Sequence, residues 1–269
     1  MATTLSTRFR LLCLASARHL LLATLAIGPC LSASQALIEF RRDLAFDVGT
    51  IDGVAERAYR GHLRALAAAN LLDVDTELLD RLRRLVERLR PAAAFERPDA
   101  VRTTWEVHTC RRCGENASSM AGGRMLVGEE FIGDLALTDN ELGYILAHEM
   151  AHVLAEHVRE FATTARFFVG NGPNRDYEDI QRELDDSYSV NLRMAPLVIQ
   201  QEIEADFIGF VLGARAGFDP AGMPQMLRKL NGGSVSALAM HPGERERLLR
   251  VNAMLETARR VHEVGLARQ

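Results

Sequence analysis

The chain has 269 residues, of which 48% are hydrophobic, and its formal net charge at pH 7 is −4. This length and apolar content are sufficient to bury a substantial core within one domain. The weakly negative charge offers no electrostatic attraction for a nucleic acid, so nucleic acid is not expected as a partner.

Residues 1–36 have the composition of a targeting segment. Arginines come early, a short apolar run follows over residues 20–31, and small residues offer a cleavage site after Ala33 or Ala36. This layout is typical of a secretory signal peptide, which predicts export to the bacterial periplasm and a mature domain over residues 37–269. Two alternatives stay open: an uncleaved membrane anchor, and a mitochondrial presequence, because the segment is rich in arginine and poor in acidic residues.

Residues 37–90 are predicted to be helical. Leucine and valine recur at three- and four-residue spacing over residues 79–89, and Pro91 is expected to end this helix.

The next segment is rich in β-branched and aromatic residues, which favour strands. One strand is predicted over residues 101–109, and a second begins after the turn formed by Gly122 and Gly123. The simplest arrangement is a small antiparallel sheet. Cys110 and Cys113 lie between the two strands and are expected to form a local disulfide in an oxidising compartment. A structural zinc site is disfavoured because it needs four ligands.

A long helix is predicted over residues 139–168, where Thr138 and Glu141 have the spacing of a capping box. The fold class that these elements predict is α+β: mostly helical, with a small sheet. The remaining predicted segments are a polar loop (170–190), a second long helix (196–217) and two further helices (219–230 and 243–264).

The first long helix contains the sequence HEMAH. His148 and His152 are four residues apart, so both side chains project from one helix face and can bind the same metal ion. Zinc accepts neutral imidazole nitrogen, which makes this pair candidate zinc ligands. Glu149 is rotated by about 100° and is placed to act on a water molecule as a general base, as in the H-E-x-x-H arrangement.

The alternative for this motif is a structural helix whose histidines bond to their neighbours. The apolar surroundings weaken that alternative, because two unsatisfied imidazoles would be costly there. His157 lies nine residues after His148, about 180° round an unbroken helix, so it is expected to pack or to face solvent and not to share the metal.

A catalytic zinc site needs a third protein ligand and an open coordination position. Glu202 and Asp206 share one face of the second long helix, and Glu202 is the predicted ligand of a single zinc ion per chain. Asp206 would accept a hydrogen bond from the distal ring nitrogen of a ligating histidine. Glu204 lies about 160° from that face and should point elsewhere.

Four stretches occur in order within residues 100–255: NASSMAGGRMLVGEEFI, LTDNELGYILAHEMAHVLAEH, EIEADFIGFVLGARAGFDP and MHPGERERL. Together they resemble the zinc metallopeptidases that include HtpX and the CAAX prenyl proteases, family forty-eight of the metallopeptidases. The resemblance implies a zincin-like (gluzincin) fold. The membrane spans of HtpX and the prenyl proteases are not found, which points to the soluble, exported branch of the family.

The resemblance also implies roles for residues outside the zinc motif. His241 or Arg247 would supply a second electrophile for the developing oxyanion, or the His-Pro segment would gate the cleft. An extended substrate would pair with a strand edge around residues 120–127. The residues assigned to substrate binding are Asn116, Ala117, Gly122 and Gly123.

The predicted function is therefore that of a zinc-dependent metalloendopeptidase acting on unfolded or misassembled proteins in extracytoplasmic quality control. Peripheral association with a membrane is a further expectation. One alternative is a different zinc hydrolase that uses Cys110 or Cys113 as a ligand. Another is a zinc-stabilised chaperone or scaffold that binds client proteins without cutting them.

Overall fold

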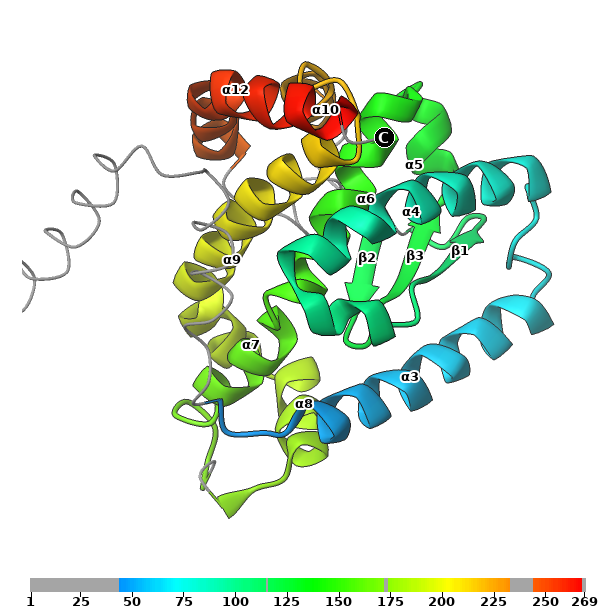
Figure 1. Ribbon diagram of the computed structural model, residues 1–269. Helices are drawn as coiled ribbons and strands as arrows, with labels where there is room; N and C mark the ends of the chain where they lie inside the picture. The colour runs from blue at the N-terminus through cyan, green and yellow to red at the C-terminus, as the bar shows by residue number, and fades with distance from the viewer. Residues whose placement is uncertain (1–43, 115, 172–173, 233–243, 268–269) are drawn as a thin grey trace, which may run out of the picture.

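The structure is a computed structural model that describes residues 44–114, 116–171, 174–232 and 244–267. The predicted leader (residues 1–36) and His241 of the His-Pro segment lie outside these described residues. Within them the chain is mostly helical with a small sheet, as predicted, and that sheet has three strands where two were predicted (Figure 1). No helix in the described ranges combines the length and the apolar character needed to cross a bilayer.

The helices are α3 (Val48–Ala68), α4 (Thr76–Glu96), the 3-10 helix η1 (Pro98–Arg102), α5 (Glu129–Asp134), α6 (Asp139–Leu154), α7 (His157–Ala165), α8 (Tyr177–Asp186), α9 (Tyr188–Arg215), α10 (Gly222–Gly232) and α12 (Glu244–Leu266). The strands are β1 (Glu106–Cys110), β2 (Ala117–Met120) and β3 (Arg124–Gly128).

The sheet is mixed, and not antiparallel as predicted. Its order is β1-β3-β2, with β1 parallel to β3 and β2 antiparallel to β3. The prediction was wrong because β2, the sequence ASSM, has little intrinsic strand preference, and the chain reverses once more than expected. The first strand also begins later, at Glu106, since residues 98–102 form η1. β3 is therefore central and paired on both sides, so the free strand edge predicted around residues 120–127 is wrong, and the edge strand is β2.

Pro91 does not end α4, which continues to Glu96. A proline inside a helix costs about 3 kcal/mol through its lost N–H donor and its ring clash. The helix buries a continuous stripe of leucine, valine and alanine on both sides of Pro91, and this packing outweighs the cost. The helix stops at Arg97, which precedes Pro98 and takes an extended conformation (φ −139°, ψ 101°).

The predicted helix over residues 139–168 is two helices. α6 starts with the expected capping box at Thr138 and Glu141. It ends at Leu154, and Glu156 then adopts a left-handed conformation with φ 56° before α7 begins. Arg97 stabilises the break, because its Nη1 donates to the Leu154 carbonyl at 2.6 Å and its Nη2 contacts Glu156 at 2.5 Å. A contact from a distant segment thus decides where α6 ends.

The predicted polar loop over residues 170–190 contains α8, and α9 begins well before Pro196. The buried residues of α8 are Tyr177, Ile180 and Leu184, which follow a three- and four-residue spacing. The polar residues between them concealed this amphipathic pattern.

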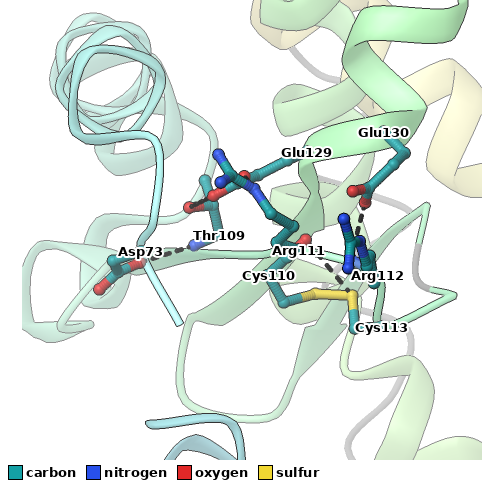
Figure 2. Close-up of a disulfide and its surroundings, with 8 residues drawn as sticks. All are labelled: Asp73, Thr109, Cys110, Arg111, Arg112, Cys113, Glu129 and Glu130. Carbon is teal, nitrogen blue, oxygen red and sulfur yellow. Dashed lines mark hydrogen bonds and ion pairs between the residues drawn. A yellow bond between two sulfur atoms is a disulfide. The ribbon is translucent and has the colours of Figure 1, made fainter. Parts of the chain in front are cut away.

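Figure 2 shows that Cys110 and Cys113 are joined by a disulfide across the turn that follows β1. Two carboxylates of α5 hold this turn. Glu129 accepts a hydrogen bond from Arg111 Nε at 2.7 Å, and Glu130 accepts one from the backbone N–H of Arg112 at 2.9 Å. The turn is thereby fastened to α5.

α6 is the central helix of the main core and packs against α9, α4, α10 and β2 (Figure 1). Its contact with α9 is unusually close at Gly209, where an added Cβ would lie 2.9 Å from both the backbone N and Cα of His148. Only a residue without a side chain fits this contact unchanged. The contact fixes the distance between the two helices that carry the candidate zinc ligands.

The substitution Gly209→Ala is expected to push α9 away from α6. The free energy of unfolding should fall by about 1–3 kcal/mol, the range for overpacked sites, and zinc affinity should fall with it. Chemical denaturation and a zinc competition assay measure the two effects. Gly133→Ala is the matched control, since a Cβ there meets nothing within 4 Å. Equal stability and zinc affinity in Gly209→Ala and the wild type would show that the close contact is not required.

Candidate metal centre

Three side chains from two helices converge on one point. His148 and His152 come from α6, and Glu202 comes from α9. The Nε2 atoms of the two histidines are 3.0 Å apart. Glu202 places Oε2 at 3.3 Å from His148 Nε2 and Oε1 at 3.4 Å from His152 Nε2.

The two spacings to Glu202 match those of a tetrahedral zinc ion, and the 3.0 Å between the two Nε2 atoms is a few tenths of an ångström shorter. Ligand atoms that lie 2.0–2.1 Å from zinc at tetrahedral angles are about 3.3–3.4 Å from one another. The donor set of two imidazoles and one carboxylate is that of a catalytic zinc site, with one coordination position left for water or substrate. In the part of the chain that the structure describes, these three residues form the one group of potential metal ligands, and neither cysteine belongs to it.

Glu149 is buried and lines a cavity of about 300 Å³ together with His152. The cavity lies between β2 and the helices α7, α8 and α9. Its other lining residues are Ala117, Ser118, Ser119, His157, Val158, Phe161, Gln181 and Gln201. A substrate in this cavity would therefore meet the predicted base and a metal-facing histidine on one side and the edge strand on the other.

Asp206 lies behind His148, one of the candidate ligands. Its Oδ1 is 3.1 Å from Nδ1 of His148, so the carboxylate can fix the ring with Nε2 toward the metal position. Arg247 of α12 binds Asp206 through Nε at 2.6 Å and through Nη2 at 2.7 Å. Burial would raise the pKa of Asp206, but Arg247 outweighs it and holds that pKa below its usual value.

Arg247 also contacts Glu202, with Nη1 at 3.1 Å from Oε2. The guanidinium is buried between the two carboxylates and does not line the cavity that contains Glu149. This position suits an anchor for the ligand carboxylate better than an electrophile that meets the substrate. A direct catalytic role for Arg247 stays a prediction.

The predicted substrate-binding residues separate into two groups. Ala117 of β2 lines the cavity beside Glu149, and the carbonyl of Asn116 accepts a hydrogen bond from Gly128 N at 2.9 Å at the end of β3. Gly122 and Gly123 form the turn between β2 and β3 with φ of 80° and 88°, which glycine adopts without strain.

The two glycines do not line the cavity beside Glu149. Gly122 borders a separate cavity of about 340 Å³, and a Cβ on Gly123 would lie 2.5 Å from Thr103. Ser118 and Gln181 of the cavity wall were not predicted because β2 and α8 were not recognised, and Phe161 was not predicted because the break between α6 and α7 was not recognised. The alternation of small polar residues in ASSM was the one local signal for β2.

His157 is buried, and not on the far side of a continuous helix as assumed. The break at Glu156 turns its ring back toward the site, with His157 Nδ1 at 2.8 Å from His152 Nδ1. Packing was one of the two expected outcomes, but the reasoning from an unbroken helix was wrong. Glu204 points away from the metal position as predicted, and its Oε2 lies 3.5 Å from His157 Nε2.

The two ligating histidines have opposite protonation tendencies in the metal-free protein. Burial alone would lower the pKa of His148, yet hydrogen bonds to Asp206 and Glu202 overcome it and raise that pKa to about 9. Burial lowers the pKa of His152, which favours its neutral form. A zinc ion that binds Nε2 of His148 would have to displace the proton that this raised pKa favours near neutral pH.

The metal-free protein is expected to lose stability as the pH rises from about 6.5 to about 9. The pKa of His148 is higher in the folded chain than in the unfolded one, so its contribution is complete below about pH 6.5 and disappears as the pH passes about 9. The full effect is at most about 3 kcal/mol. The lowered pKa of His152 acts only below about pH 6.5 and does not overlap this window.

Urea denaturation in the presence of a chelator, repeated across this pH range, measures the effect. His148→Gln is the control and should remove most of the slope. A wild-type stability that does not change between about pH 6.5 and about pH 9 would contradict the assignment.

Comparisons with known proteins identify the family of this chain. Residues 78–255 match Peptidase family M48. The chain is similar to the mitochondrial metalloendopeptidase OMA1 of Arabidopsis thaliana, with 30% identity over 172 residues, 61% of this chain and 35% of the relative. The OMA1 proteins of Saccharomyces cerevisiae and Schizosaccharomyces pombe are each 26% identical, over 59% and 57% of this chain and 49% and 48% of those relatives.

The chain thus spans half or less of the length of these curated relatives. The matched residues include α6 with HEMAH, α9 with Glu202 and Asp206, and Arg247 of α12. Because the family match covers well over half of the chain, the chain belongs to peptidase family M48.

Proposed function

We propose that this chain is a zinc-dependent metalloendopeptidase. The observation that carries the proposal is the convergence of His148, His152 and Glu202 next to a cavity that Glu149 also lines. Ligands, base and substrate space thus come together from α6, α9 and β2, as hydrolysis of a peptide bond requires.

His148, His152 and Glu202 would hold the zinc ion. When bound, zinc supplies a Lewis acid and makes a water molecule acidic near neutral pH. Glu149 takes a proton from the attacking water and passes it to the nitrogen of the leaving amine. Asp206 keeps His148 in the ligating orientation, and Arg247 anchors both Asp206 and Glu202.

The edge strand β2 offers a place for an extended substrate. β2 pairs with β3 on one side and contributes Ala117, Ser118 and Ser119 to the cavity wall. A peptide that adds to such an edge is recognised mainly through its main chain, which gives affinity with little sequence preference. The small side chains of β2 leave room for the substrate. This supports unfolded or misassembled proteins as substrates and a role in protein quality control.

For the location of the protein, the names of the relatives support the mitochondrial interpretation of residues 1–36 and give no support to the periplasmic one. The arginine-rich, acid-poor composition of that segment agrees with a presequence. An import assay with residues 1–36 fused to a reporter distinguishes mitochondrial from secretory targeting.

Two alternatives are weaker. A zinc hydrolase with a cysteine ligand conflicts with the disulfide between Cys110 and Cys113 and with their absence from the ligand group of the described residues. A zinc-stabilised scaffold would keep the three ligands, but it gives no reason for a buried carboxylate at Glu149 beside a substrate-sized cavity.

Glu149→Gln is expected to abolish chelator-sensitive cleavage of casein, with a loss of at least about 100-fold, because the base is removed. Zinc content and thermal unfolding should stay close to those of the wild type, since Glu149 is not a ligand. Glu77→Gln, on the exposed start of α4, is the control for the loss of one carboxylate. Full cleavage by Glu149→Gln would favour a different hydrolytic mechanism, and loss of zinc would show that Glu149 holds the metal.

Glu202→Gln is expected to reduce zinc content below one ion per chain and to abolish cleavage, because the carboxylate ligand is lost. Cys113→Ala should keep zinc, because neither cysteine lies in the ligand group of the described residues. Elemental analysis of the purified variants measures zinc directly. The opposite pattern, with zinc lost only from Cys113→Ala, would replace this ligand set by one that includes a cysteine.

A further inference from the structure

His157 is a buried histidine that the proposed mechanism does not use. It is 3% exposed and is the first residue of α7, directly after the left-handed residue Glu156. Its ring lies 4.8 Å from the ring of His152 in an edge-on arrangement, with the two Nδ1 atoms 2.8 Å apart. On the other side, its Nε2 faces Glu204 of α9, with Oε2 at 3.5 Å.

The break between α6 and α7 is what creates this arrangement. In a continuous helix His157 would be rotated by about 140° from His152 and would point away from it. Gln201 helps to hold the first turn of α7 in place, because its Nε2 donates to the His157 carbonyl at 3.1 Å and to Glu160 at 2.7 Å. The strained residue Glu156 therefore places one histidine against another.

Metal binding by His152 would determine where the ring hydrogens of His152 and His157 lie. If Nε2 of His152 gives its lone pair to zinc, the ring hydrogen of His152 must be on Nδ1. That hydrogen can be accepted only if Nδ1 of His157 is unprotonated, so the hydrogen of His157 must be on Nε2. Glu204 supplies the carboxylate beside this Nε2, with Oε2 at 3.5 Å, and a small approach of the two groups would complete the hydrogen bond.

We propose that His157 and Glu204 are positioning residues that orient His152 for zinc binding through a carboxylate–histidine–histidine chain. The inference rests on the proposed zinc site and adds two residues to it. Asp206 supports His148 directly, whereas Glu204 supports His152 through His157. Each ligating imidazole thus has its own carboxylate, and such outer partners typically change metal affinity or activity by 10- to 100-fold.

His157→Phe tests the proposal by replacing the ring nitrogens with a similar shape. Zinc affinity, measured by competition with a chelator, is expected to fall by about 10- to 100-fold. Glu204→Leu should also weaken zinc binding, and Glu204→Gln should restore part of it, because the amide oxygen can still accept from His157 Nε2. Val158→Ala is the matched control: it changes the same helix and cavity wall but removes no polar atom, and it should keep the zinc affinity.

Nitrogen-15 NMR of histidine-labelled, zinc-loaded wild-type protein provides a second readout that does not depend on how the variants fold. It should show His157 with its hydrogen on Nε2 and with Nδ1 unprotonated. A hydrogen on Nδ1 of His157, or wild-type zinc affinity in folded His157→Phe, would overturn the proposal. A KM effect without a change in zinc affinity would also overturn it and would make His157 part of the substrate cavity.

Failure of the zinc site itself gives a different result. If the wild-type protein binds no zinc, the proposed function and this inference both fail. If the wild type binds zinc and cleaves casein while His157→Phe binds zinc equally well, only the positioning role of His157 and Glu204 fails.

Discussion

The close contact between α9 and α6 is the constraint on which the site depends. At Gly209 the backbone of α9 reaches the backbone of His148, an approach that a Cβ would prevent. Asp206 and Glu202 lie one and two turns before Gly209 on the same face of α9. Once the two helices meet at that distance, Asp206 faces the distal nitrogen of His148 and Glu202 faces the metal-side nitrogens of both histidines. The packing of a glycine thus sets the geometry of the candidate metal centre.

The charged groups of the site are buried and pair with one another. His148, Glu202, Asp206 and Arg247 are all nearly inaccessible to solvent. Buried charges are costly unless each is paired, and removal of one partner leaves another uncompensated. In the metal-free protein Arg247 pairs with both carboxylates, and the raised pKa of His148 favours its protonated form as a second positive charge. A zinc ion would take the place of that proton, so the same contacts that orient the ligands also prepare a site for positive charge.

Local patterns were enough to predict which residues converge as candidate ligands, but not their surroundings. His148, His152, Glu202 and Asp206 follow helical spacing, and the capping box at Thr138 is equally local. By contrast, the end of α6 depends on Arg97, which lies more than fifty residues earlier in the chain. Strand β2 exists because β3 pairs with it, and Pro91 is tolerated because of packing. The position of His157 could not be predicted for this reason: it follows from a helix break that a distant residue stabilises.

A crystal structure of the zinc-loaded protein, with anomalous scattering recorded at the zinc edge, tests the central claim most directly. The account predicts one zinc ion per chain, bound by Nε2 of His148, Nε2 of His152 and the carboxylate of Glu202 at about 2.0–2.2 Å. A zinc ion whose ligands exclude Glu202, or include a cysteine sulfur at about 2.3 Å, would contradict it.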